Sequence, residues 1–224
     1  MNVIANNIAN VDTPGFKADR MMFEEVLRDV GTPDRAAFVH DIGVVSDLRD
    51  GTMDPTGNPL DLAIQGQGYF EVETDQGVRY TRGGSFQFDA DGAVIDGNGH
   101  PLLAEDGFPI FALPGDGEMK IDANGVVSSD SGEIGRLALV TFDDPQALLK
   151  VGQNLYSSDA DPNPAVEATV LQGFVERSNV EPIVEMTRMI TVLRSYQGAQ
   201  ALANKQDELR RRAINVLGNM SQQA

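Results

Sequence analysis

The feature that most constrains this chain is a long helical run near its C-terminus. From Pro182 to about Met220, only Gly198 and Gly218 are poor helix formers. Apolar residues recur along it at helical spacing, with a shift of phase near Gly198; they are Met186, Met189, Ile190, Leu193, Tyr196, Leu202, Leu209, Ala213, Val216 and Met220. Such a helix would extend ~58 Å at 1.5 Å per residue. One compact domain cannot cover it, so part of its apolar face needs a partner.

The start of this helix is marked by residues typical of a helix N-terminus. Ser178 and Asn179 are good N-cap residues, and Pro182 fits the first helical turn. With Ser178 as the N-cap, Glu181 three residues later completes a capping box. Ser178 or Asn179 is therefore the expected cap of a helix that runs from Pro182 to about Met220.

The N-terminal end also carries a helical pattern. An apolar stripe is formed by Met1, Ile4, Ile8 and Val11. Residues 12–15 (Asp-Thr-Pro-Gly) end it. No N-cap precedes the stripe, so we expect the native helix to begin upstream of Met1. A second short helix is predicted at about residues 20–30, with Met22, Phe23, Val26 and Leu27 on one side.

The middle of the chain, residues 41–170, differs from the ends in its composition and in its pattern of apolar residues. It holds 18 of the 23 Gly and 8 of the 11 Pro. Short apolar runs at residues 62–64, 69–72, 85–88 and 137–140 alternate with Asp-Gly and Asn-Gly turn clusters at residues 89–92, 97–99 and 122–125. This pattern predicts an antiparallel β domain that folds on its own.

Charge is unevenly distributed along the 224 residues. The net charge is −17, and residues 41–170 account for all of it, with 23 acidic and 6 basic residues. Such acidity disfavours nucleic acid as a partner. The near-neutral ends are expected to pack against something, with the acidic middle in solvent. No apolar run approaches the ~18 residues of a membrane span, so no membrane insertion is expected. The absence of a cleavable signal by itself indicates a cytoplasmic protein.

Candidate chemical sites are weak. There is no Cys, and the two histidines, His40 and His100, lie far from any serine in a nucleophile context. Residues 89–92 (Asp-Ala-Asp-Gly) lack the later ligands of a calcium loop and are better explained as a hairpin turn. Residues 66–68 (Gly-Gln-Gly) lack the remaining parts of a phosphate loop, and residues 210–212 (Arg-Arg-Arg) suit a solvated helix face. No catalytic residue, metal site or cofactor is predicted.

Four motifs, in order and spread over most of the chain, resemble those of the flagellar rod and hook family. The first is Asn6-Asn7-Ile8-Ala9-Asn10 followed by Pro14-Gly15-Phe16-Lys17. The second is Gly57-Asn58-Pro59-Leu60-Asp61 with Gly66, Gly68 and Phe70, and the third is Tyr80-Thr81-Arg82. The fourth is Glu176-Arg177-Ser178-Asn179-Val180-Glu181-Pro182 with Met186, Met189 and Ile190.

The resemblance implies a fold and a role. It implies an α+β protein with an N-terminal helical segment and turn (residues 1–40), a β-rich outer domain (residues 41–170) and a long C-terminal helix (residues 171–224). The terminal helices would pair into a coiled-coil-like stalk, and subunits would stack into a shaft that carries torque. Partners would be other rod subunits and the flagellar export apparatus. Export would place the protein in the periplasmic rod without a cleavable signal, which revises the cytoplasmic expectation.

The resemblance also assigns the site residues to assembly. The N-terminal motif and the C-terminal helix (Ser178, Asn179, Val180, Met186, Met189, Ile190, Leu193, Tyr196, Leu202 and Leu209) would form interfaces. The short connection before the β domain favours the proximal rod type. Residues 196–199 (Tyr-Gln-Gly-Ala) also depart from the distal and hook pattern Tyr-Glu-x-Asn. A distal rod or hook-type subunit is one alternative. Another is an acidic β-domain binding protein, with or without bound calcium, that carries a coiled-coil oligomerisation tail.

Overall fold

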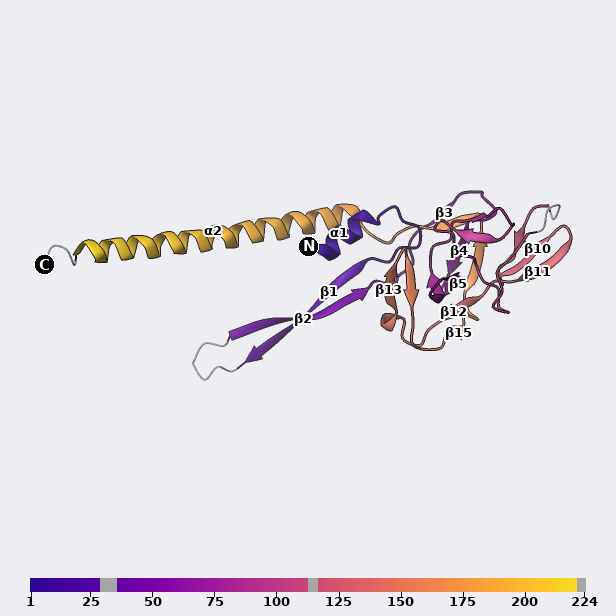
Figure 1. Cartoon of the computed structure of the whole chain (residues 1–224), viewed down its shortest axis with the longest axis horizontal. Coiled ribbons are helices and arrows are strands. Elements are labelled where there is room, and N and C mark those ends of the chain that lie inside the picture. The colour runs from indigo at the N-terminus through magenta and orange to yellow at the C-terminus, as the bar shows by residue number, and fades with distance from the viewer. Residues whose placement is uncertain (29–35, 113–116, 221–224) are drawn as a thin grey trace. The chain divides into compact units, whose positions relative to one another are not determined.

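The computed structural model describes residues 1–28, 36–112 and 117–220 (Figure 1). The chain divides into two compact units. One contains Met1–Ile8 and Glu181–Ala224, and the other contains Ala9–Val180. We call them the helical unit and the β unit. The class is α+β, as predicted, with antiparallel strand pairing throughout the described β unit.

The two predicted terminal helices are present. Helix α1 spans Asn2–Ala9, and helix α2 spans Pro182–Met220. Helix α1 ends two residues earlier than its apolar stripe, because a turn follows in which the Thr13 amide donates to the Asn10 carbonyl. The predicted capping box is wrong. Helix α2 begins after Glu181, whose carbonyl accepts from the Glu185 amide, while the Ser178 hydroxyl accepts from the amide of Val180. Pro182 sets the start because it fits the first turn.

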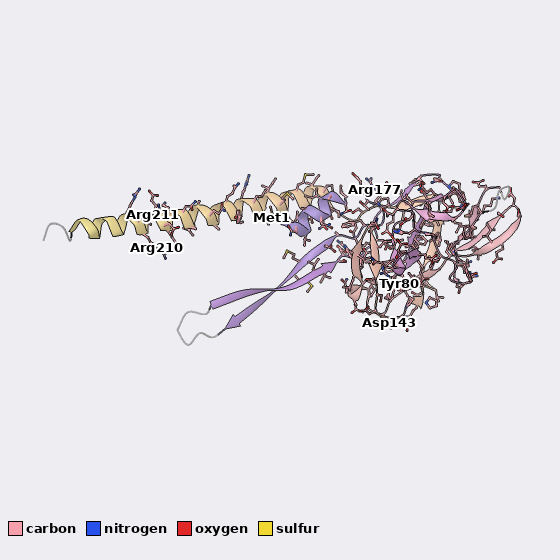
Figure 2. The ribbon with its side chains drawn as sticks, in the orientation of Figure 1. Met1, Tyr80, Asp143, Arg177, Arg210 and Arg211 are labelled. Carbon is pink, nitrogen blue, oxygen red and sulfur yellow. The ribbon has the colours of Figure 1, made fainter. Side chains whose placement is uncertain are left out.

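As far as Leu209, the apolar stripe of α2 is largely exposed in the single chain. Exposed fractions reach 62% for Tyr196, 61% for Leu202 and 58% for Leu209. Figure 2 shows side chains standing out from α2, Arg210 and Arg211 among them. Apolar side chains that stay in water add little to the stability of a helix, because most helical stability in proteins comes from packing an apolar face against a partner. The expectation that α2 needs a partner therefore stays open.

The β unit is built from seventeen short strands in the described residues. The first nine are β1 (Asp19–Arg28), β2 (Ala36–Ser46), β3 (Met53–Pro55), β4 (Leu62–Gln65), β5 (Tyr69–Thr74), β6 (Gly77–Thr81), β7 (Phe86–Phe88), β8 (Val94–Asp96) and β9 (Lys120–Ile121). The others are β10 (Val126–Ser129), β11 (Gly132–Arg136), β12 (Leu139–Thr141), β13 (Leu149–Gly152), β14 (Leu155–Ser157), β15 (Asn163–Pro164), β16 (Thr169–Gln172) and β17 (Phe174–Glu176). A 3₁₀ turn, η1, spans Pro145–Ala147.

These strands form one larger sheet and several small ones. The six-stranded sheet has the order β13-β14-β6-β5-β12-β15, and the three-stranded sheet has the order β11-β10-β9. The remaining pairs are β16-β4, β17-β3, β7-β8 and β1-β2. The pairs β16-β4 and β17-β3 join the last two strands of the β unit to strands between residues 53 and 65.

The predicted helix at about residues 20–30 is wrong over the residues that the structure describes. Residues 19–28 form β1, which pairs with β2 in an antiparallel ribbon from Asp19↔Ser46 to Arg28↔Ala36. Residues 29 and 30 lie outside the described part. The sequence carries β-favouring signals here as well, since Met, Phe and Val fit a strand as readily as a short helix. Figure 1 shows this ribbon extending from the other strands as a separate arm.

The predicted turns at residues 89–92, 97–99 and 122–125 follow one design. In each, the Oδ1 atom of an aspartate (Asp89, Asp96 or Asp122) accepts hydrogen bonds from the backbone N–H groups two and four residues later. A glycine three residues after the aspartate takes a positive φ of 88°, 92° or 78°. The first turn joins β7 to β8 and the last joins β9 to β10, which confirms hairpin turns at both places.

Two apolar clusters support the described sheets. The larger includes Phe70 and Phe86, whose rings meet edge to face with centroids 5.4 Å apart. The smaller contains Tyr69, Tyr80 and Tyr156 with Val140 and Phe142. The predicted strand residues Leu62, Ile64 and Phe70 are almost fully buried. The β unit thus has a core of its own.

We expect a fragment of residues 9–180 to unfold cooperatively and at a higher temperature than one of residues 41–170. The shorter fragment lacks β17 and part of β16, so β3 and part of β4 lose their partners. Circular dichroism melts of the two purified fragments check this. An equal melting temperature would mean that residues 9–40 and 171–180 add nothing to the β unit. The division at residues 40 and 170 stays a prediction.

Replacing Tyr156 with Phe should raise the free energy of unfolding by about 1 kcal/mol. Among the residues that the structure describes, the Tyr156 hydroxyl is a buried polar atom with no hydrogen-bond partner. Burial accordingly raises the pKa of this phenol. Urea titrations of wild type and Y156F measure the change, and Y156L serves as a control that loses the ring contact with Tyr69. Destabilisation by Y156F would show that the hydroxyl is satisfied in solution.

Candidate functional site

The segments that enter and leave the β unit are bonded to each other. The Gly15 amide donates to the Glu176 carbonyl at 2.7 Å, and the Asn179 amide donates to the Phe16 carbonyl at 3.4 Å. The Ala18 amide donates to the Asn179 side-chain Oδ1 at 2.8 Å. We call residues 9–18 and 174–180 together the clasp. The clasp therefore joins the segment that follows α1 to the segment that precedes α2.

Gly15 is required by the geometry of the clasp. Its φ of +70° is a conformation that residues with a side chain rarely adopt. A Cβ atom at this position would lie 2.2 Å from the carbonyl oxygen of Arg82, which is backbone and cannot move aside. The Pro-Gly of the N-terminal motif therefore lets the chain press against the end of β6.

Four charged residues, which we call the ion cluster, hold the clasp together. The Glu176 carboxylate accepts from Lys17 Nζ at 2.7 Å and from Arg82 Nε at 2.8 Å. Arg82 Nη2 also donates to Asp50 at 2.8 Å, and Lys17 Nζ lies 3.7 Å from the same oxygen. The side chains of Lys17, Arg82 and Glu176 are at most 3% exposed, whereas that of Asp50 is 43% exposed. Two buried cations thus depend on one fully buried carboxylate.

The remaining donors of the ion cluster are also satisfied. Arg82 Nη1 donates to the carbonyls of Gly66 and Gly68, and Nη2 donates to that of Ile64. Lys17 Nζ donates to the Arg49 carbonyl, and the Gly51 amide donates to Glu176 Oε1. Residues 66–68 therefore present carbonyl oxygens to a cation and do not form an N–H cradle for phosphate. Buried charges are tolerated only with such complete pairing.

The surroundings set the charge state of the cluster. Burial by itself would raise the pKa of the Glu176 carboxyl, but the neighbouring charges of Arg82 and Lys17 outweigh it and hold that pKa below its ordinary value. Burial lowers the pKa of the Lys17 amine, and Glu176 offsets part of that effect. The carboxylate is therefore ionised at neutral pH and binds both cations.

Further contacts fasten the N-terminal half of the clasp to the β unit. Lys150 Nζ donates to the Lys17 carbonyl at 2.8 Å and to Asp19 at 2.7 Å, and lies 4.7 Å from the centre of the Phe16 ring. Asn154 Nδ2 donates to the Pro14 carbonyl at 2.8 Å. Phe16, Ala18 and Val180 form a buried apolar cluster with Val11 packed against it. This cluster is separate from the two clusters of the sheets.

The structure brings together part of the predicted site. Residues of all four motifs meet at or beside the clasp; they are Pro14, Gly15, Phe16, Lys17, Gly66, Gly68, Thr81, Arg82, Asn179 and Val180. The turn of residues 57–61 instead holds the strand ends near Gly173, and Phe70 and Tyr80 belong to the sheet cores. Asn6, Asn7 and Ala9 lie on α1, and Asn10 follows it. The interface roles of these residues and of the α2 stripe stay predictions.

Sequence reasoning missed Asp50 and Glu176 as site residues. Glu176 stands at the end of an apolar strand, Phe174-Val175-Glu176, where a buried carboxylate signals a buried cation. The fourth motif contains Glu176, but nothing in the motif indicates which cation its carboxylate binds. Asp50 lies in a connecting segment, and nothing in its local pattern distinguishes it from other acidic residues of the middle of the chain.

Three further places are candidates for a chemical site: His100, His40 and a hollow beside β12. His100 Nδ1 lies 2.9 Å from Asp96 Oδ2, within a turn. His40 lies opposite Glu24 in the register of the β1–β2 ribbon. A hollow of about 520 Å³ beside β12 is lined by residues such as Glu71, Arg136 and Pro164. In the described part of the chain, no three His, Cys, Asp or Glu residues are arranged to hold a metal ion. None of its helices is long and apolar enough to cross a membrane.

The fold and the clasp define a class of protein in which the segments that lead into and out of a β unit are bonded to each other. Three family descriptions match the chain in the same order: flagella basal body rod protein at residues 1–17, the D1 domain of the flagellar hook proteins FlgE/F/G at residues 63–129, and the C-terminal region of the flagellar basal body rod FlgEFG proteins at residues 171–216. Lys17, Arg82 and Glu176 each fall in a different matched region.

Whole-length relatives agree with these matches. The flagellar basal-body rod protein FlgF of Caulobacter vibrioides is 36% identical over 99% of this chain and 93% of its own length. FlgF of Mesorhizobium japonicum is 33% identical over 99% and 92%, and the rod protein FlgG of Bacillus subtilis is 34% identical over 96% and 92%. The chain belongs to the flagellar basal-body rod protein family and is most like FlgF.

The stability of the β unit should fall at acid pH because of Glu176. The folded pKa of this carboxyl lies below its unfolded value of ~4.3, so its stabilisation is complete above that value. The stabilisation is lost as the pH falls through the folded pKa. At neutral pH, Glu176→Gln should lower the free energy of unfolding by about 3–5 kcal/mol, because two buried cations lose their partner.

Urea titrations between pH 7 and pH 3 measure this effect. Glu176→Gln should show a shallower loss of stability with acid than wild type, and the exposed Glu167→Gln should keep the wild-type slope. Identical slopes in all three proteins would contradict a titrating role for Glu176.

Proposed function

We propose that this chain is a structural, non-enzymatic subunit of the bacterial flagellar basal-body rod, of the proximal type, which polymerises into the shaft that transmits motor torque to the hook. The observation that carries the proposal is the ion cluster. Each of its buried members falls in a separate region that matches a flagellar rod or hook description. The similarity to FlgF relatives over nearly the whole chain supports the same role.

The mechanism rests on the position of the clasp. Helix α1 ends just before residue 10, and helix α2 begins just after residue 181. The clasp therefore joins the two segments from which these helices continue. In the rod, the two helices would pair with each other and with those of neighbouring subunits in a coiled-coil-like inner stalk. The exposed stripe of α2, with Tyr196, Leu202 and Leu209, would be covered there. Torque applied to the stalk would pass to the β unit through the clasp.

Charge and route of delivery fit the same arrangement. The excess negative charge of residues 41–170 suits an outer, solvated position for the β unit. Other rod subunits and neighbouring rod proteins would be the direct partners in the periplasmic space. The flagellar export apparatus would deliver the chain without a cleavable signal. No cofactor enters this role.

A distal rod subunit is the second candidate. The 34% identity to FlgG of Bacillus subtilis over 96% of the chain favours it almost equally. A deletion strain distinguishes the two. Basal bodies from the deletion should lack the rod beyond its first segment if the chain is proximal, and should retain a proximal rod if it is distal. Intact rods in the deletion strain would contradict both assignments.

Replacing Leu193 with Asp should abolish rod formation while leaving the β unit folded. Leu193 lies in the apolar stripe of α2, outside the β unit, and a carboxylate buried there in an assembled stalk would have no partner. The measurement is the count of complete basal bodies in electron micrographs of the complemented deletion strain. The purified variant should melt like wild type.

Ser195→Asp is the matched control for this variant. It places the same charge two residues along the exposed helix, about 200° around its axis at ~100° per residue. We expect S195D to support rods. Rods formed equally well by L193D would mean that the stripe faces solvent in the polymer.

A further inference from the structure

The N-terminal half of the clasp depends on residues that come much later in the chain. Residues 15–18 are bonded mainly to Glu176 and Asn179, through the contacts of Gly15, Lys17 and Ala18. Lys17 and Glu176 are separated by 159 residues. The apolar cluster around Phe16 likewise includes Val180 and is distinct from the sheet cores. These partners do not exist for the N-terminal segment until the end of the β unit has docked.

The ion cluster makes this dependence strong. Without Glu176, Lys17 and Arg82 would share only Asp50, whose side chain is 43% exposed and 3.7 Å from Lys17 Nζ. Placing two cations in a nearly solvent-free site with one half-exposed carboxylate is unfavourable, because lost hydration is not replaced. Before Glu176 is in place, the N-terminal segment can contact Asp47, Lys150 and Asn154, but its docking would bury Lys17 without its closest carboxylate.

The sheet cores do not share this requirement. Strand β5 pairs with β6 and β7 pairs with β8, and the six-stranded sheet that contains β5 and β6 includes neither β17 nor residues 9–18. Strand β17 then pairs with β3 and places Glu176 beside Gly51 and Arg82. The clasp can open through loss of its own contacts while these sheets stay intact.

We infer that the clasp is a latch that closes last and opens first, and that the Glu176 carboxylate controls it. Residues 174–180 supply the carbonyl that binds the Gly15 amide, the carboxylate that binds Lys17 and the side chain that binds the Ala18 amide, so residues 15–18 have their full set of contacts only in a completed chain. This device rests on the proposed function for its use: a subunit would present both helices for assembly only after its whole β unit has formed. The latch itself is a property of the single chain and is tested without any polymer.

Native-state hydrogen exchange of the full chain tests the latch. The amides of Gly15 and Ala18 report the clasp, and those of Val94 and Leu102, which donate to the carbonyls of Ile110 and Val94, report the sheet core. In wild type, the clasp amides should exchange through a local opening and be at least about tenfold less protected than the core amides. Equal protection of the two sets would overturn the inference, because the clasp would then open only with the whole β unit.

Two variants separate charge from packing. Glu176→Gln should reduce protection of the Gly15 and Ala18 amides at least about a hundredfold, with the Val94 and Leu102 amides much less affected. Lys17→Met leaves Arg82 paired with Glu176, so its effect on the Ala18 amide should be at least tenfold smaller. Equal effects of the two variants would show that packing, and not the carboxylate, holds the clasp. Glu167→Gln, at an exposed carboxylate, is the control variant. The exchange measurements use the single chain, so their outcomes do not depend on whether the chain forms rods.

Discussion

Burial of two cations against one carboxylate is the interaction on which the arrangement of this chain depends. Lys17 comes from the N-terminal segment, Arg82 follows β6, and Glu176 ends β17. None of these groups could be buried alone, since an unpaired charge in the interior is strongly unfavourable. Their mutual need joins the beginning, middle and end of the β unit. A hydrophobic contact between two of these segments would stabilise them without the third, whereas the ion cluster requires all three.

This constraint explains why a structural subunit carries what resembles a chemical site. Buried ionisable side chains with shifted pKa values often mark catalytic centres. Here the carboxylate oxygens are used by Lys17, Arg82 and the Gly51 amide, and the guanidinium is used by carbonyls and Asp50. The cluster therefore joins the segment that follows α1 to the segment that precedes α2.

Much of this could be predicted from the sequence, and the failures have physical causes. The length of α2, the hairpin turns at Asp89 and Asp122 and the apolar strand at Leu62 follow from local patterns, which the structure confirms. The helix predicted at about residues 20–30 is wrong over its described part, because pairing with β2, which is non-local, makes residues 19–28 a strand. The partner of Glu176 could not be deduced either, since Lys17 lies 159 residues away.

A double-mutant cycle between Lys17 and Glu176 tests the central claim most directly. The free energy of unfolding would be measured for wild type, Lys17→Met, Glu176→Gln and the double variant. If balanced buried charge holds the clasp, the double variant should be less destabilised than the sum of the two single variants, with a coupling of at least about 1 kcal/mol. Costs that simply add would contradict the account, because they would show that the two side chains stabilise the β unit independently.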